Sequence, residues 1–550
     1  MDRCGEDFQM NAKLSLANFP PSLITILISN LVFTLLYPQA TMMQSALVSN
    51  ILPALLPSIL PCILIVLAVK LWSVYNENTR DTKCPAPLPE GSMGWPFIGE
   101  TIQLVTQGAE FYRKKYLKHG RVFKTHILGQ PTIRAIGADN VRRILQGEGD
   151  IVTSHYPFTV RSVLGSRSIV ISSGAEHDRL RKLVSKAFRF DCLSQYVPYI
   201  QQYAQDAIER WCDRGEVLGL EECRALVFGV AGKLLCGFQY DENETKRLTS
   251  VFEEMIDNMF SFPVDLPGTR FHKAIKNRNI LHRHIEDSLK EKRDRADSSD
   301  SEFRDLLQVI CTEAGDDGEE KMDTEKLKEL ALELLFAGHT TTASASTMLL
   351  VYLYQNPHII EKIRRELDEH QLLDDECQLT FGTIVQLKYV SCVVKEILRI
   401  SPPVGAGYRK VIKTFELEGK QVPVGWTVVF SIRETQKYAT NFTKPDEFDP
   451  DRFMPDREED KQGDRFNYIP FGGGPRGCVG KQLALLFLKI FVVTLARSCR
   501  WQLVNPEELK VCLMPSPHPV DGLPLRFSRF DCNANRVDLK IGNEVKGLEC

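Results

Sequence analysis

The sequence predicts a mainly α-helical body with minor β-sheets, an α+β arrangement, joined to an N-terminal membrane anchor. Three observations support this fold class. Apolar residues at helical spacing dominate residues 99–527, strand-like runs there are few and short, and a long uncharged stretch lies near the N-terminus. The composition, 43% hydrophobic and 25% charged, is typical of a globular protein.

The anchor is expected within residues 1–83. No charged residue or histidine occurs from Leu14 to Val69, and about 20 apolar residues suffice for a helix across a bilayer. Two segments qualify, residues 21–36 and 51–72, so one span or a two-span hairpin both remain open. A cleaved secretory signal is disfavoured because the stretch is too long and follows acidic residues.

The globular body is expected over residues 84–527 and a loosely held tail over 528–550. Proline and glycine crowd residues 85–99, which predicts a stiff, turn-rich connection to the anchor. Helical spacing predicts helices over residues 181–188, 199–211, 247–260, 279–293, 323–355 and 482–496. Short apolar runs predict strands over residues 122–128, 132–136 and 427–431.

Charge and cysteine usage exclude some classes of protein. The formal net charge of -3 gives no sign of nucleic-acid binding. The 15 cysteines are scattered and form no C-x-x-C pair, which favours a reducing compartment over a disulfide framework.

A glycine-rich loop carries the strongest functional signal. It matches the pattern F-x-x-G-x-R-x-C-x-G at Phe471, Gly474, Arg476, Cys478 and Gly480. Glycines let backbone N–H groups approach a sulfur, and the following helix should lower the thiol pKa. A thiolate in such a loop suits haem iron, because it donates electron density that favours O–O cleavage. We therefore expect Cys478 to be the axial ligand of a haem.

Two further motifs lie upstream of this loop. Glu396 and Arg399 form an E-x-x-R on an apolar helix, and Arg452 can complete a triad that holds the cysteine loop. In the helix predicted over residues 323–355, which Asp323 or Thr324 can cap, a glycine and threonines interrupt good helix formers. We expect a local distortion or groove there, in which Thr340 and Thr341 hold O₂ and carry protons.

Other charged residues are candidates for haem binding. Arg476 should point towards a haem propionate. His177, Arg181 and Arg409 are expected to be further propionate partners.

These motifs, in this order, resemble the cytochrome P450 superfamily over about residues 85–527. The resemblance implies the cytochrome P450 fold, haem b bound through Cys478, and the Glu396–Arg399–Arg452 triad. A narrower resemblance, to the family 26 retinoic-acid hydroxylases, rests on residues 88–100, 137–145, 413–417 and 519–524.

The narrower resemblance implies hydroxylation of all-trans-retinoic acid, chiefly at ring carbon 4. It also implies O₂ as co-substrate and electrons from NADPH through a membrane-bound cytochrome P450 reductase. The anchor fits the endoplasmic reticulum membrane, with the catalytic domain in the cytosol. A lipophilic substrate and a membrane are therefore expected partners, and nucleic acid is not.

The sequence departs from the expected patterns in three places, of which the last two lie in substrate-facing regions. Thr340 stands where an acid is usual, Tyr156 where relatives often carry Trp, and the segment at residues 403–409 differs slightly from its usual form. The expected pocket wall is Tyr156, Phe260, Phe262, Phe336, Val404 and the segment 515–519 that contains Pro517. The residue that binds a substrate carboxylate is not identifiable from the sequence.

Three alternatives stay open at this point. A sterol or fatty-acid hydroxylase shares every catalytic motif. A haem-thiolate isomerase or dehydratase needs neither O₂ nor a reductase, but such enzymes tend to lose the threonine found here at Thr341. A non-catalytic retinoid-binding membrane protein would not require the intact loop and triad.

Overall fold

The computed structural model describes residues 61, 63–127, 129–294, 303–313 and 322–530. The chain divides into two compact units after Val74. In the first unit, residues 63–74 are helical. Among the described helices, none is both long enough and apolar enough to cross a bilayer. The first predicted span, residues 21–36, lies outside the described residues. Residues 51–60 and 62 of the second predicted span, 51–72, lie outside them as well.

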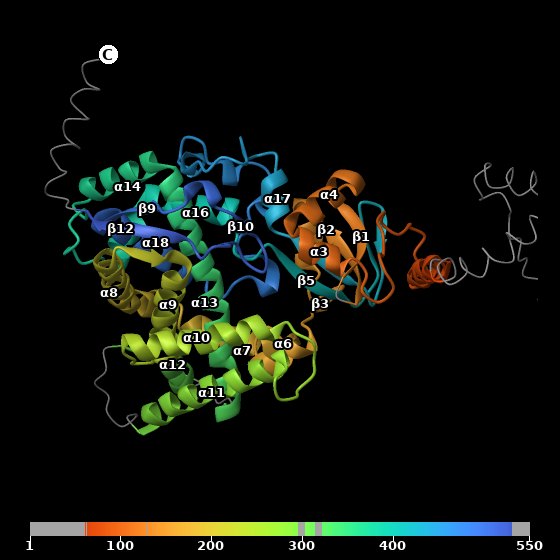
Figure 1. Ribbon diagram of the computed structural model, residues 1–550, viewed down its shortest axis with the longest axis horizontal. Helices are drawn as coiled ribbons and strands as arrows, with labels where there is room; N and C mark the ends of the chain where they lie inside the picture. The colour runs from red at the N-terminus through yellow and green to blue at the C-terminus, as the bar shows by residue number, and fades with distance from the viewer. Residues whose placement is uncertain (1–60, 62, 128, 295–302, 314–321, 531–550) are drawn as a thin grey trace, which may run out of the picture. The chain divides into compact units, whose positions relative to one another are not determined.

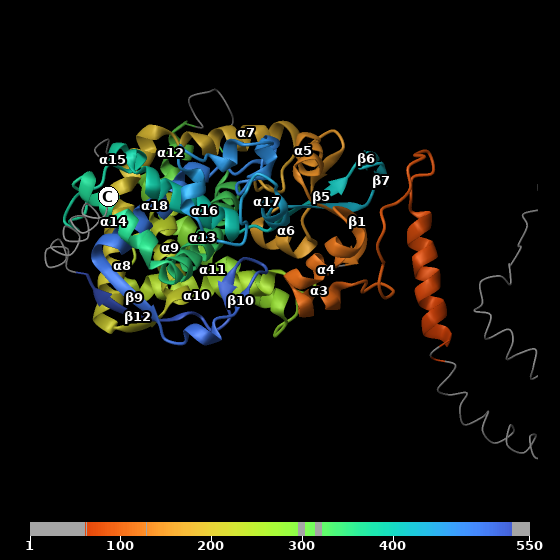
Figure 2. The same cartoon turned by 90° about the horizontal axis from the view of Figure 1, so that it is seen from above.

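The second unit is mostly helical (Figures 1 and 2). Its α-helices are α3 (Thr101–Gln107), α4 (Ala109–His119), α5 (Ala138–Gln146), α6 (Phe158–Leu164), α7 (Gly174–Lys186), α8 (Phe190–Arg214), α9 (Gly219–Ala231), α10 (Glu242–Met259), α11 (Arg270–Asp294), α12 (Leu306–Glu313), α13 (Thr324–Gln355), α14 (Pro357–Glu369), α15 (Phe381–Gln386), α16 (Lys388–Ile400), α17 (Arg433–Tyr438) and α18 (Lys481–Ser498).

Short helices of other types are the π-turn η2 (Gly232–Cys236) and the 3₁₀ turns η3 (Pro450–Phe453), η4 (Glu459–Lys461), η5 (Arg465–Asn467), η6 (Gly474–Arg476) and η7 (Pro506–Glu508). The strands are β1 (Val122–Ile127), β2 (Gln130–Ala135), β3 (Val152–Ser154), β4 (Glu216–Leu218), β5 (Ala406–Val411), β6 (Phe415–Leu417), β7 (Lys420–Val422), β8 (Thr427–Ser431), β9 (Cys499–Leu503), β10 (Val511–Cys512), β11 (His518–Pro519) and β12 (Pro524–Arg529).

The strands form small, separate sheets. The largest has the order β1-β2-β8-β5-β3, in which β2 and β8 are parallel and the other pairs antiparallel. Helices α3 and α4 pack beside β1 and share with it a small apolar cluster that includes Leu104, Phe111 and Phe123. The predicted helix-rich fold with minor sheets is confirmed.

The main core surrounds α13. This helix is buried on most sides and packs against α9, α11 and α18, so beyond its charged first turns it carries mostly apolar and small side chains on all faces. Its N-cap is Asp323, whose side chain accepts a hydrogen bond from the Lys326 N–H at 2.7 Å. Aromatic side chains such as Trp211 and Phe491 fill the space between α8 and α18.

Several helices begin earlier than predicted. Helices α8 and α11 begin nine residues before their predicted starts, and the added turns bury apolar side chains such as Tyr196 and Phe271. Helices α7 and α10 begin seven and five residues before theirs. Strand β12 pairs with β9 through Arg529, and Phe530 is buried under the guanidinium of Arg364 at 3.7 Å. The packed body therefore continues three residues beyond the predicted boundary at residue 527.

Candidate active site

The cysteine loop connects η6 to α18. The Cys478 N–H donates to the Phe471 carbonyl at 2.9 Å, and the Gly477 N–H donates to the Gly474 carbonyl at 3.1 Å. Gly474 has a φ of +67°, and a Cβ there would lie 2.4 Å from the Leu145 carbonyl oxygen of α5. Only glycine fits this close approach, so the glycine in the motif sets how closely the loop packs on α5.

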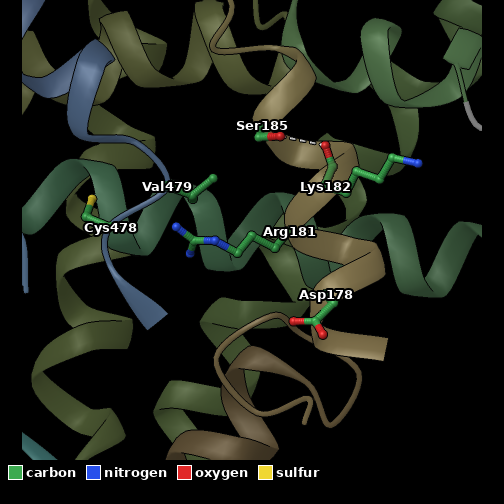
Figure 3. A pocket seen from close by; sticks show the side chains of 6 residues that line it. All are labelled: Asp178, Arg181, Lys182, Ser185, Cys478 and Val479. Carbon is green, nitrogen blue, oxygen red and sulfur yellow. Dashed lines mark hydrogen bonds between the residues drawn. The ribbon is translucent and has the colours of Figure 1, made fainter. Parts of the chain in front are cut away.

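Cys478 is exposed as a residue at a pocket of about 360 Å³, although protein atoms surround much of its sulfur (Figure 3). The pocket is lined by Asp178, Arg181, Lys182, Ser185, Cys478 and Val479. Arg181 reaches across from α7, and its Nη1 donates to the Gly477 carbonyl at 2.6 Å. Arg181 therefore ties α7 to the residue beside the thiol.

The expected lowering of the thiol pKa is wrong for the protein alone. Burial raises the pKa of Cys478, and the Gly480 N–H, Arg181 and Lys481 oppose this shift without reversing it. The helix N-terminus is present as predicted, but desolvation of the thiolate is the larger effect. A bound cation would change the balance, because a thiol that coordinates a metal is deprotonated outright.

Arg409 and Arg476 converge on one carboxylate. Arg409 Nε donates to Glu148 Oε2 at 2.6 Å, and Arg476 Nε donates to Glu148 Oε1 at 3.0 Å. All three side chains are about nine-tenths buried. Glu148 also accepts the Ser154 N–H at 3.2 Å. Arg409 and Arg476, which the sequence predicted as separate propionate partners, are thus held side by side by Glu148. The sequence analysis did not identify Glu148.

The segment from Ile169 to Ser172 is held from two sides. Arg476 donates to the carbonyls of Ile169, Val170 and Ser172 at 3.3, 3.4 and 2.7 Å. From α13, the buried carboxylate of Glu333 accepts the N–H groups of Ile169 and Val170, both at 2.6 Å. The cysteine loop and α13 therefore position the same stretch of backbone.

Glu333 should make stability depend on pH. Burial raises the pKa of Glu333 to about 7, against the lowering by the N–H donors and Arg476, whereas an unfolded glutamate titrates near about 4.3. Between these values the folded protein binds more protons than the unfolded chain. The stabilisation that Glu333 contributes to the folded protein should therefore fall as the pH rises from about 5 to about 7.

Chemical denaturation of the wild type and Glu333→Gln at pH 5, 6 and 7 checks this prediction. The variant should lose about 1–3 kcal/mol at pH 5, because one backbone N–H loses its acceptor. The difference in free energy of unfolding between wild type and variant should shrink as the pH rises to 7. Other groups that titrate on unfolding, such as Glu253, whose pKa burial raises to about 7, and His282, whose pKa burial lowers to about 4, are common to both proteins and cancel in this difference. An unchanged pH dependence would contradict the assignment to Glu333.

The middle of α13 differs from the expectation of a distorted helix. The helix is continuous through Ala337 and Thr342. Thr341 Oγ1 donates to the Ala337 carbonyl four residues earlier at 2.7 Å, and Thr340 Oγ1 is buried with no hydrogen-bond partner among the described residues. Ala337 is exposed although Leu335 and His339 near it are buried. The small residues therefore open a short accessible strip on an unbroken helix.

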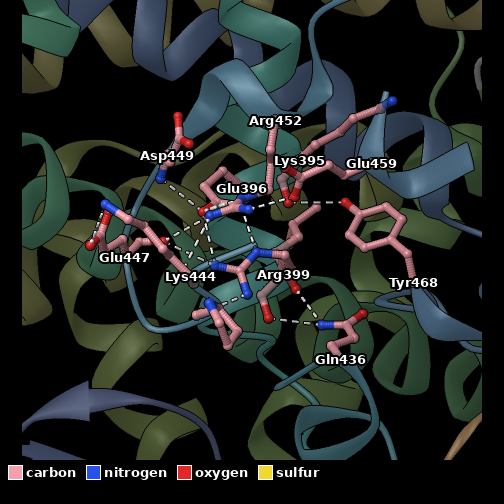
Figure 4. Close-up of polar contacts among 12 residues, drawn as sticks. Lys395, Glu396, Arg399, Gln436, Lys444, Glu447, Asp449, Arg452, Glu459 and Tyr468 are labelled. Atoms are coloured by element: carbon pink, nitrogen blue, oxygen red, sulfur yellow. Dashed lines mark hydrogen bonds and ion pairs between the residues drawn. The ribbon is translucent and has the colours of Figure 1, made fainter. Parts of the chain in front are cut away.

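The three residues of the predicted triad lie together and are almost fully buried (Figure 4). Arg399 contacts Glu396 at 2.7 and 2.9 Å, and Arg452 contacts Glu396 at 3.1 Å. The two arginines also donate to the carbonyls of Thr443, Lys444, Pro445 and Glu447. The cluster thus fixes the loop before η3.

A second acid, Glu459, completes this cluster. Arg452 Nη1 contacts Glu459 Oε2 at 2.7 Å, and Arg457 and Thr443 bind the same carboxylate. Burial raises the pKa of Glu459, but hydrogen bonds from Thr443, Arg457 and Arg452 outweigh it and lower the pKa to about 2. Gln436 extends the cluster by donating to the Leu398 and Arg399 carbonyls and accepting the Ile469 N–H.

The remaining predicted residues are dispersed. His177 is buried on α7, where its Nδ1 lies 3.1 Å from Asp178. Tyr156 and Phe336 pack half-buried against the main core. Phe260, Phe262 and Val404 are 60%, 84% and 43% exposed. The carbonyl of Pro517 accepts a hydrogen bond from Ser344 of α13 at 2.6 Å, which brings the C-terminal segment to this helix.

Comparison with known proteins decides the family. The profile of the family described as Cytochrome P450 matches residues 89–519. The chain belongs to the cytochrome P450 family. It is 43% identical to cytochrome P450 26A1 of Gallus gallus over 471 residues, which are 84% of this chain and 94% of that protein. It is 41% identical to human cytochrome P450 26B1 over 481 residues, 86% of this chain and 93% of that protein.

A solved cytochrome P450 shares the fold. The cyanobacterial CYP120A1 with retinoic acid bound is 32% identical, with a TM-score of 0.74, and the match covers 81% of this chain and 100% of that one. These findings confirm the predicted resemblance to family 26 and the cytochrome P450 fold. The protein is a monooxygenase that takes a lipophilic substrate and uses haem, O₂ and electrons from a reductase.

The residues at this site fit a cytochrome P450 haem. A thiol in a loop before a helix can ligate iron, and the exposed strip at Ala337 leaves a face of α13 uncovered. Arg409 Nη2 has no acceptor among the described residues, so it can still bind a carboxylate. The donors therefore match a group that carries two carboxylates.

Proposed function

We propose that this cytochrome P450 hydroxylates all-trans-retinoic acid, chiefly at ring carbon 4, for its catabolism. The observation that carries the proposal is the likeness to a cytochrome P450 solved with retinoic acid bound, which the chain matches over that protein's full length. The likeness to cytochromes P450 26A1 and 26B1 over more than four fifths of this chain points the same way.

Cys478 is proposed to be the axial ligand of haem b. When bound, the haem supplies O₂ activation and delivery of one oxygen atom to a C–H bond. The Gly480 N–H, Arg181 and Lys481 favour the thiolate form of Cys478. They do so by offering positive charge and a hydrogen bond close to the sulfur.

Arg181, Arg409 and Arg476 are proposed to neutralise the two haem propionates. Together they carry three positive charges, of which Glu148 balances one through its bonds to Arg409 and Arg476. The remaining surplus of two positive charges matches the two carboxylates of a haem. Fixed, preorganised guanidinium groups lose little entropy when they bind such carboxylates.

Thr341 is proposed to hold water and pass protons at its Oγ1. Its hydroxyl already donates to the Ala337 carbonyl at the exposed strip of α13, so its oxygen can accept a hydrogen bond from water. Thr340 has no carboxylate to share this task, and its buried hydroxyl offers one further donor. Proton transfer therefore depends on Thr341 and water rather than on an acid.

The test is a turnover assay. Haem-loaded protein is incubated with all-trans-retinoic acid, NADPH and reductase, and the products are analysed by mass spectrometry. A product that gains one oxygen atom and is absent without NADPH supports the proposal. If haem-loaded protein yields no product, the substrate assignment fails, and sterols, fatty acids and peroxides become the candidates.

We further propose that an NADPH-dependent cytochrome P450 reductase docks beside Cys478 at the endoplasmic reticulum membrane, on the cytosolic side. Lys182 borders the pocket at the thiol and Lys186 follows one helical turn later on α7. Lys481, which is exposed, begins α18 nearby. Basic side chains there suit an acidic partner surface. Lys489 is unsuited to this role because burial lowers its pKa.

Charge reversal should separate docking from catalysis. Lys182→Glu/Lys186→Glu should slow reductase-supported turnover about tenfold at low salt and weaken its dependence on salt, because steering by opposite charges is lost. Lys413→Glu, at an exposed position elsewhere, is the control and should leave the rate unchanged. Turnover and salt dependence equal to wild type in the double variant would rule out this docking surface.

A further inference from the structure

One arginine near the predicted substrate segments has no acidic partner. Arg134 in β2 contacts Glu434 at 2.7 Å, and Arg409 in β5 and Arg476 in the cysteine loop share Glu148. Arg433, which directly follows β8 and Ile432, forms no ion pair with any residue that the structure describes. Its neighbour Glu434 is already bound to Arg134 and Ser431.

The guanidinium of Arg433 is only partly used. Its Nη2 donates to the Leu513 carbonyl at 3.0 Å, its Nε is buried without a partner, and its Nη1 has no acceptor within the described part of the chain. Burial lowers the pKa of Arg433, and Glu434 opposes this only in part. A desolvated charge without a counter-charge is unfavourable, so this arrangement calls for an anion.

Arg433 lies between two segments that carry predicted pocket residues. A Cβ on Gly405 would lie 2.9 Å from Arg433 Nη2, so the guanidinium occupies the place of a side chain beside Val404. The Ile432 and Arg433 N–H groups both donate to the Gly405 carbonyl, at 2.9 and 3.1 Å. Leu513, on the other side, precedes the segment that Ser344 ties to α13 through Pro517.

We propose that Arg433 binds the carboxylate of the substrate and makes the enzyme select acids over neutral analogues. A planar guanidinium with donors to spare can bind a carboxylate through two parallel hydrogen bonds. The glycine at position 405 matters because any larger side chain there would displace the guanidinium. The inference rests on the proposed function only in naming retinoic acid as the acid.

Ligand-induced changes in haem absorbance measure the binding of all-trans-retinoic acid and of all-trans-retinol, which has the same chain without the carboxylate. Arg433→Met should weaken binding of the acid about tenfold or more and leave binding of the alcohol within about twofold. Arg433→Lys, which keeps the charge, should recover part of the loss. Lys413→Met is the control for removal of a charge, with a side chain that is 69% exposed.

The outcomes separate this inference from the proposed function. If Arg433→Met weakens binding of the acid and the alcohol equally, the inference is overturned, because Arg433 then only holds Leu513. If the variant binds both as tightly as the wild type does, the inference is also overturned. If wild-type protein does not bind retinoic acid, the proposed function fails and the same comparison is made with palmitic acid and hexadecanol. Loss of preference for that acid in Arg433→Met supports the inference, and no preference in the wild type overturns it.

Discussion

Replacing Cys478 with serine should abolish retinoic acid turnover. A serine hydroxyl stays protonated and cannot donate the electron density that a thiolate gives to iron. The loss should therefore exceed the about 10–100-fold that follows mutation of an outer partner of a metal ligand. The change in the ligand should also alter the absorbance of the reduced carbon monoxide complex, which reports on the iron independently of turnover.

Cys311→Ser is a matched control for Cys478→Ser. Cys311, on α12, is the other exposed cysteine among the described residues, so the same chemical change is made away from the loop. It should keep both the spectrum and the turnover of the wild type. Wild-type spectrum and turnover in Cys478→Ser would contradict the assignment of the ligand.

Replacing Glu396 with alanine should prevent accumulation of folded, haem-loaded protein. The substitution leaves the buried guanidinium groups of Arg399 and Arg452 without their shared carboxylate. Breaking a buried ion pair from one side costs about 3–5 kcal/mol, against a total stability of about 5–15 kcal/mol for a typical domain. Glu459 still neutralises Arg452, so Arg399 should be the more disturbed of the two.

Soluble yield, haem content and the midpoint of thermal unfolding measure the effect. Lys444→Ala is the control, because the Lys444–Glu447 pair is 75% and 60% exposed, and the Lys444 carbonyl that faces Arg452 is kept. An exposed pair contributes about 0–1 kcal/mol, so this variant should behave as the wild type. Equal stability of Glu396→Ala and Lys444→Ala would contradict a structural role for the triad.

The local patterns in the sequence predicted much of the site. The glycine spacing around Cys478 was recognisable as a pattern in the sequence. The structure gives its physical reason, because any side chain at Gly474 would collide with the backbone of Leu145. The E-x-x-R pair was recognisable because residues three apart share one helix face. The order of these motifs, rather than any one alone, pointed to the fold.

Partners distant in sequence were not predictable in the same way. Glu148 and Glu333 are ordinary acids in the sequence, and only the fold brings them to Arg409, Arg476 and the backbone at Ile169. The raised pKa of Cys478 was missed because helix position is visible in the sequence while desolvation is not. Arg433 was missed because the sequence does not show that its neighbour Glu434 is bound to Arg134 instead.

The most direct test of the account is to run the retinoic acid reaction under isotopically labelled O₂ with NADPH and reductase. Mass spectrometry should find a product that carries one labelled oxygen atom, formed only when NADPH is present and lost in Cys478→Ser. A product whose added oxygen is unlabelled, a product formed without NADPH, or no product from haem-loaded protein would contradict the assignment of this chain as a retinoic acid monooxygenase.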